Sequence, residues 1–225
     1  MKKSLTRLLP FVLWLQTSPV LALSNISGRV EVLEEENSKS KVVVNVWVYV
    51  DGLEMEVSPE VLDKRYTIRM ENKSFAPRVE AVPAGGTVNF PNVDKIMHNA
   101  FSLSRGNRFD LGLYKAGAAK KHRFESPGLV RIYCNIHPQM SAFVLVVDNP
   151  YFAKVQPNGA YRIAGVPPGT YTVKAWNEKA RGQKRVTVGK SGARGVNFTL
   201  DGRRFKRTIH LNKFGKPYKR KRGKY

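Results

Sequence analysis

Residues 129–140 read LVRIYCNIHPQM, in which an alternating strand pattern runs directly into a short loop. The loop carries Cys134, His137 and Met140, and a second histidine, His98, lies upstream. Cys134 is the only cysteine of the chain, so it cannot form an intramolecular disulfide. Two imidazoles, one thiolate and a weak axial thioether are the ligands of a trigonal blue-copper electron-transfer site. These four side chains therefore predict a site for one mononuclear copper ion.

The sequence around this loop has the pattern of an all-β protein. Short stretches of alternating apolar and polar residues recur between residues 65 and 149, about 8–12 residues apart and separated by Gly, Pro and Asn turns. No amphipathic helical pattern lies between them. This spacing predicts a β-sandwich. A second set of alternating stretches follows a boundary at residues 148–150 and predicts a second small β unit.

Residues 1–22 have the pattern of a secretory signal peptide. Three basic residues precede an apolar run at residues 8–15, and residues 20–22 offer a small-residue cleavage site. The apolar run is shorter than the roughly 20 residues that a membrane-spanning helix needs, and no later segment approaches that length. We therefore expect an exported, periplasmic protein without a transmembrane span.

The chain is strongly basic, with 39 Lys and Arg against 17 Asp and Glu and a net charge of +22. Residues 203–225 hold 11 of the basic residues and no acidic one. Such a run is most often a solvated end, so we expect residues 202–225 to be a basic disordered tail. Its charge would also suit acidic redox partners or an anionic envelope surface. Export makes nucleic acid a poor candidate.

Residues 65–149 resemble the cupredoxins, especially the amicyanin and plastocyanin group. The matching motifs are KSFAP at residues 73–77, PAGGTVNFPN at 83–92, MHN at 97–99 and CNIHPQM at 134–140. The resemblance implies a Greek-key β-sandwich in which His98 and His137 supply imidazole nitrogens to copper. It further implies that Cys134 supplies the thiolate and Met140 a long axial contact. The spacing between His137 and Met140 is similar to that of amicyanin and shorter than that of plastocyanin.

Two further residues have expected roles beside the ligands. The resemblance implies that Asn99 ties the two ligand-bearing loops together, and such outer partners tune affinity and potential. Pro138 has no N–H, so it cannot donate a hydrogen bond to the cysteine sulfur, and its ring stiffens the loop. We expect the outer edge of His137 to lie at the surface, within a mostly apolar rim of Ile96, Met97, Pro138 and Gln139.

Residues 153–200, within the expected second β unit at residues 150–201, resemble the later half of the carboxypeptidase regulatory-like, or transthyretin-like, β-sandwich. The matching motifs are GAYRI at residues 159–163 and GVPPGTY at 165–171. Residues 28–30 and 42–50, in the N-terminal part 23–64, are similar to the first two strands of that family. The resemblance implies a discontinuous sandwich with the copper-binding unit inserted between its halves. The alternative is two domains in series, with residues 28–52 added to an edge of the first sheet.

Two functions from different classes remain open from the sequence. The first is an exported blue copper protein that carries one electron. The second is a copper-binding, storage or envelope interaction module, which the additional sandwich favours because dedicated carriers are usually single compact domains. An enzymatic role is not expected, because copper oxidases and nitrite reductases need additional copper centres and the chain has one cysteine.

Overall fold

The computed structural model describes residues 24–34, 43–206 and 210–218. The expected signal peptide lies outside these residues. Within the described ranges the chain is almost entirely β-structure, with one short helix, α1 (Pro59–Leu62), so the predicted all-β class is confirmed. No helix in these ranges is long and apolar enough to cross a membrane.

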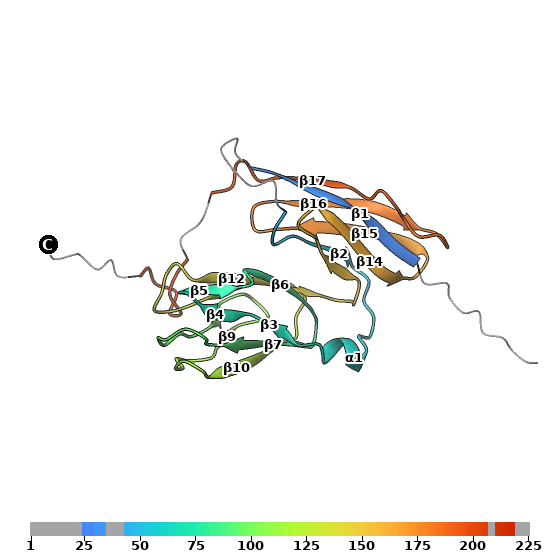
Figure 1. Ribbon diagram of the computed structural model, residues 1–225. Coiled ribbons are helices and arrows are strands. Elements are labelled where there is room, and N and C mark those ends of the chain that lie inside the picture. Colours follow the sequence, from blue (N-terminus) through green and yellow to red (C-terminus); the bar gives the residue numbers. More distant parts are fainter. Residues whose placement is uncertain (1–23, 35–42, 207–209, 219–225) are drawn as a thin grey trace, which may run out of the picture.

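Residues 66–147 form a β-sandwich, which is the lower unit in Figure 1. One sheet has the strand order β10-β7-β3 and the facing sheet has the order β6-β12-β11-β8-β9. The strands are β3 (Tyr66–Thr67), β6 (Val79–Pro83), β7 (Gly86–Pro91), β8 (Phe101–Ser102), β9 (Phe109–Asp110), β10 (Ala119–Phe124), β11 (Gly128–Tyr133) and β12 (Ser141–Val147). Their shared core contains Phe90, Phe124 and Ile132, together with Cys134 and Met140. The predicted ligand loop therefore joins β11 to β12 beside a fully packed core.

A hairpin of β4 (Arg69–Glu71) and β5 (Ser74–Ala76) lies beside this sandwich. Its turn consists of Asn72 and Lys73, both with a φ of 52°. Two successive left-handed residues are typical of a type I′ turn, and Asn is favoured there. The sequence pattern predicts a turn over residues 72–77, which is too long because Ser74–Ala76 pairs with β4.

The N-terminal and C-terminal parts of the chain pair with each other to form a second sandwich, the upper unit in Figure 1. Its sheets have the orders β14-β1-β17 and β13-β2-β15-β16. The strands are β1 (Ser24–Leu33), β2 (Trp47–Asp51), β13 (Phe152–Lys154), β14 (Ala160–Val166), β15 (Gly169–Trp176), β16 (Arg181–Val188) and β17 (Phe198–Asp201). Of the two arrangements left open by the sequence, the strand pairing is that of a discontinuous sandwich, because within the described ranges β1 and β2 pair only with strands that follow residue 150.

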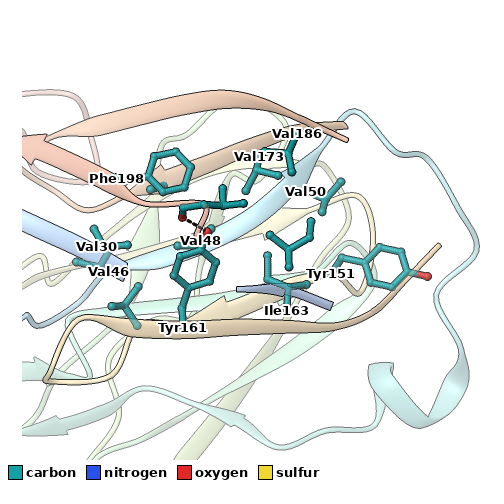
Figure 2. Close-up of a cluster of buried hydrophobic side chains, with 14 of the residues drawn as sticks. Val30, Val46, Val48, Val50, Tyr151, Tyr161, Ile163, Val173, Val186 and Phe198 are labelled. Atoms are coloured by element: carbon teal, nitrogen blue, oxygen red, sulfur yellow. Dashed lines mark hydrogen bonds between the residues drawn. The ribbon is translucent and has the colours of Figure 1, made fainter. Parts of the chain in front are cut away.

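Valine side chains fill much of the core of this second sandwich. Val48 and Val50 of β2 meet Ile163 and Phe198 from the opposite sheet, as Figure 2 shows. Tyr161 is also buried there, and its hydroxyl donates a hydrogen bond of 2.6 Å to the carbonyl oxygen of Val196. Strands with alternating β-branched residues suit such a surface, which explains why residues 42–50 read as a strand.

The two sandwiches pack against each other through the outer faces of β2 and of β6 and β12. Trp47 lies in this junction with Val79, Ala81, Leu145 and Val147. The burial pattern follows from strand geometry, because Trp47 and Val48 point to opposite faces of β2. Strand β12 is buried on both faces for the same reason, which accounts for its nearly continuous apolar sequence.

Polar contacts reinforce the junction near the ligand loop. Arg78 precedes β6, and its Nη2 lies 2.6 Å from Oε2 of Glu178, which follows β15. The Nη1 of Arg78 also donates to the carbonyl oxygen of Ser141, at the start of β12, at 2.9 Å. The second sandwich is therefore attached close to the strand that leaves the ligand loop.

Part of the C-terminal tail is ordered against the first sandwich, which corrects the expectation of a disordered tail for residues 210–218. In Figure 1 this red segment lies at one end of the lower unit. Side-chain and backbone groups of the segment bind the loop after β11, for example through a hydrogen bond from the Tyr218 hydroxyl to the Cys134 carbonyl oxygen. Hydrogen-bonding groups and aromatic rings among the basic residues provide these contacts.

Candidate metal centre

The predicted ligands come from two loops at one end of the first sandwich. His98 lies in the loop between β7 and β8, where its backbone exchanges two hydrogen bonds with that of Tyr114. Cys134 is the first residue after β11. The loop after Cys134 closes on itself, because the Met140 N–H donates to the His137 carbonyl at 2.9 Å and the Cys134 N–H donates to the Met140 carbonyl at 3.3 Å.

Three donor atoms of these loops converge. His98 Nδ1 lies 3.0 Å from His137 Nδ1, and Cys134 Sγ lies 3.9 Å from His98 Nδ1 and 3.7 Å from His137 Nδ1. These three side chains form the one group of metal-ligand type found among the described residues. The structure thus brings together three of the four predicted ligands in a small triangle of two nitrogens and one sulfur.

The size of the triangle matches the bonds of a first-row transition metal. A point equidistant from the three atoms lies about 2.1 Å from each, close to zinc–nitrogen bonds of about 2.0–2.1 Å and zinc–sulfur bonds of about 2.3 Å. A set of two imidazoles and a thiolate is the trigonal set of blue-copper sites. Met140, the predicted axial ligand, is 1% exposed and belongs to the same core cluster as Cys134. The residues present therefore fit one copper ion.

Asp94 orients the ring of His98, a role that was not predicted. Its Oδ2 accepts a hydrogen bond of 2.9 Å from His98 Nε2. A carboxylate can only accept, so the proton resides on Nε2 and the Nδ1 lone pair faces the other two donors. Carboxylate–histidine–metal arrangements of this kind fix the ring and raise its basicity. The one sequence signal is the position of Asp94 four residues before His98.

Asp94 is itself held in place. Its Oδ2 also accepts a 2.8 Å hydrogen bond from the backbone N–H of Lys73, in the turn between β4 and β5. That bond, followed by the one from His98, holds the pKa of Asp94 below its ordinary value. Its backbone N–H donates to Asn92 Oδ1 at 3.1 Å. Asp94 therefore stays ionised and correctly placed to receive the His98 proton.

Asn99 connects the two ligand-bearing loops. Its Oδ1 accepts a hydrogen bond of 2.7 Å from the backbone N–H of Asn135, next to Cys134. Its Nδ2 donates to Asp110 Oδ1 at 3.2 Å. Pro138, the other residue expected to act beside the ligands, is exposed on the loop, and its carbonyl oxygen lies 2.6 Å from His210 Nε2.

The three donors differ in their access to solvent. His98 and Cys134 are fully buried, whereas His137 is partly exposed. Burial, followed by the neighbouring His98, lowers the pKa of His137, so its ring is neutral at neutral pH and offers a lone pair. Exposed apolar residues include Ile96 and Met97, which directly precede His98 in the chain, and Ile136, which precedes His137.

The other two histidines have packing roles. His122 stacks on Phe109 with ring centroids 4.0 Å apart, so it is half-buried rather than the surface residue that its basic surroundings predict. His210 stacks on Tyr133 at 3.9 Å. Neither belongs to the His98–Cys134–His137 group.

Comparison with solved structures finds likenesses to part of the chain. A purple cupredoxin from Nitrosopumilus maritimus is 25% identical over 36% of this chain and 98% of its own, with a TM-score of 0.33. A copper-containing nitrite reductase from Thermus scotoductus SA-01 is 24% identical over 42% of this chain and 27% of its own, with a TM-score of 0.36. A reduced amicyanin mutant is 21% identical over 40% of this chain and 86% of its own, with a TM-score of 0.35. No protein-family model matches the chain, and no curated protein matches it significantly. The function proposed below therefore depends on the side chains of the site itself.

Proposed function

We propose that the protein is an exported cupredoxin-type protein that binds one copper ion and carries single electrons. His98, Cys134 and His137 would hold the ion, and Met140 would provide a weaker axial contact. The observation that carries the proposal is the triangle of two imidazole nitrogens and one thiol sulfur, all within 4.8 Å of one another. Two loops at one end of the first sandwich supply these donors.

The donor set suits both oxidation states of copper. Soft sulfur ligands favour Cu(I), and imidazole suits both Cu(I) and Cu(II), so the same side chains can serve each state. When bound, copper would supply a one-electron couple. The protein supplies a site that is already assembled: Asp94 aims the His98 ring, and Asn99 ties its loop to Asn135. Little rearrangement is then needed as the charge changes.

His137 is the ligand placed to exchange electrons with a partner. It is partly exposed. Ile136, its neighbour in the chain, is exposed, as are Ile96 and Met97, which directly precede His98. An apolar surface of this kind suits the small, short-lived interfaces of redox encounters. The net charge of +22 for the full chain would attract acidic redox proteins. The same charge would favour an anionic envelope surface.

Spectroscopy of the copper-loaded protein tests the proposal. The Cu(II) form should be intensely blue with a narrow copper hyperfine splitting in EPR, and Cys134→Ser should abolish the blue band. His122→Gln is a matched control, because His122 lies outside the donor triangle. A reversible one-electron wave in voltammetry should accompany the colour. Copper binding without colour or without a reversible wave would contradict electron transfer and support the alternative, copper storage or handover.

A further inference from the structure

Residues 210–218, here called the C-terminal segment, contact the ligand loop at three positions. The Tyr218 hydroxyl donates to the carbonyl oxygen of Cys134 at 3.0 Å. The backbone N–H of Lys213 donates to Asn135 Oδ1 at 3.0 Å. The Nε2 of His210 lies 2.6 Å from the carbonyl oxygen of Pro138. The segment therefore binds the loop both before and after the proposed ligand His137.

The segment also joins the hydrogen bonds that connect the two ligand-bearing loops. Lys213 Nζ lies 2.7 Å from Asp110 Oδ2. Asp110 Oδ1 accepts from Asn99, and Asn99 accepts from the backbone of Asn135. Since Asn135 in turn accepts from Lys213, these four residues close a ring of hydrogen bonds. The ring fixes the residue after Cys134 relative to the residue after His98.

The C-terminal segment has a defined conformation of its own. Asn212 Oδ1 accepts hydrogen bonds from the backbone N–H groups of Phe214 and Lys216, and the Gly215 N–H donates to the Asn212 carbonyl at 2.9 Å. His210 stacks on Tyr133 with ring centroids 3.9 Å apart and an interplanar angle of 15°. Tyr133 directly precedes Cys134. The turn and the stacked ring thus hold Lys213 and Tyr218 in place over the loop.

The ligand loop needs such support because it has few hydrogen bonds of its own. Within residues 134–140 the backbone makes two bonds, from Met140 to His137 and from Cys134 to Met140. Ile136, Pro138 and Gln139 are exposed. A binding loop that is already ordered loses less conformational entropy when its ligand binds. A binding site also depends on neighbours that lock its side chains.

We propose that the C-terminal segment positions the copper ligands, with Lys213 and Tyr218 holding the loop of residues 134–140 in its binding conformation before metal arrives. This inference rests on the proposed function and deepens it. The segment also covers the Tyr133 side of the site, which directs electron exchange to the exposed edge of His137. The basic tail therefore serves the metal site in addition to any role in attracting partners.

Hydrogen exchange of the full-length, metal-free protein tests this positioning. Tyr218→Phe changes little volume and removes the hydroxyl that donates to the Cys134 carbonyl oxygen and lies 3.5 Å from His210 Nδ1. Lys213→Ala removes the ion pair with Asp110. Each should raise the amide exchange rates of residues 134–140 roughly three- to tenfold, the effect of losing one net hydrogen bond. Lys216→Ala is the matched control, because the Lys216 side chain is exposed and only its backbone N–H enters the hydrogen bonds described above. Lys213→Arg should restore the wild-type rates.

Copper binding provides the second readout. Tyr218→Phe and Lys213→Ala should weaken copper affinity by a similar factor and shift the reduction potential and the copper hyperfine splitting, whereas Lys216→Ala should change none of them. Exchange rates that match the wild type in both variants would overturn the inference, whatever the colour of the protein. Failure of the proposed function is distinct, because it appears in the wild type as copper binding without a blue band.

Discussion

The carboxylate of Asp94 determines which ring nitrogen of His98 faces the metal site. Asp94 accepts the Nε2 proton at 2.9 Å and leaves Nδ1 facing Cys134 and His137. Substitution of partners of this kind typically lowers metal affinity about 10- to 100-fold. We therefore expect Asp94→Asn to weaken copper binding by that factor, because the amide is uncharged and can turn its NH₂ group toward the ring. Competition with a chelator of known copper affinity measures the change.

The control for this substitution is Asp63→Asn, at an exposed position outside the site. It should leave copper affinity within about twofold of the wild type, since isolated surface substitutions have small effects. Equal affinity of the Asp94 variant and the wild type would show that the His98 ring is held by its own packing. In that case the carboxylate would have no part in the site.

At the residue scale, the sequence predicts best what lies close together in the chain. Cys134, His137 and Met140 occupy one short loop, so their chemistry is visible from spacing alone. His98 completes the ligand set by its chemistry, but its closeness to Cys134 is not visible from spacing, because the sheet topology that brings the two together is not local. Asp94 was not predicted, because a loop aspartate is most often solvated and no sequence pattern states which ring nitrogen it faces.

Strand β6 shows how burial of an element changes the chemistry of one side chain. The second sandwich covers the outer face of β6, where Val79 and Ala81 are fully buried. Glu80 lies between them in sequence, so its side chain points to the opposite face of β6. Burial raises its pKa to about 7, against lowering effects from the Ala81 N–H and from Lys154. The folded protein therefore binds this proton more tightly than the unfolded chain does.

The direction of the pH effect follows from this difference. A carboxyl whose pKa is raised on folding stabilises the fold fully below its unfolded pKa of about 4.5, and this stabilisation is lost as pH rises through about 7. We expect the free energy of unfolding of the metal-free protein to fall by about 2 kcal/mol between pH 5 and pH 8, since each pKa unit corresponds to about 1.4 kcal/mol. Glu80→Gln should remove most of this slope in urea titrations. Glu56→Gln, at an exposed position, should keep it.

The sequence predicts the extent of a strand where alternating side chains mark it. It does not predict the end of a strand where a side chain forms a turn. The alternating pattern of residues 120–125 predicts a strand, and β10 spans Ala119–Phe124. The pattern of residues 109–114 also predicts one strand, but β9 ends at Asp110. Asp110 Oδ1 accepts a hydrogen bond from the Gly112 N–H, and Gly112 has a φ of 66°. This Asx turn, which the alternation conceals, redirects the chain.

At the scale of the whole molecule, the sequence offered the discontinuous sandwich only as one of two arrangements. The motifs at residues 28–30 and 42–50 carry that possibility, but long-range pairing depends on register across more than 100 residues of intervening chain. The contacts of residues 210–218 were not predictable at all. These contacts are hydrogen bonds to backbone carbonyl oxygens and to the Asn135 side chain of the ligand loop. The basic composition of the segment does not indicate that it makes such hydrogen bonds.

The junction between the sandwiches should make them unfold together. Trp47 is 8% exposed and packs against Val79, Ala81, Leu145 and Val147 of the first sandwich. Trp47→Ala leaves a cavity at this contact, and truncation of a buried Trp typically costs about 3–5 kcal/mol. We expect one calorimetric transition in the wild type. In the variant we expect two, in which the second sandwich melts first, while the blue colour follows the later transition.

The expected order of melting follows from the position of Trp47 in the second sandwich. Trp47 belongs to β2, which pairs with β13 and β15 in the second sandwich, whereas the donor triangle depends on loops of the first. Val44→Ala is the matched control, because Val44 precedes the same strand but is 59% exposed. It should keep a single transition within a few degrees of the wild type. The Trp47 variant could instead show a single transition and lose its colour at the same temperature. That result would mean that the Arg78–Glu178 ion pair and the chain connections, rather than this apolar contact, make the two sandwiches unfold together.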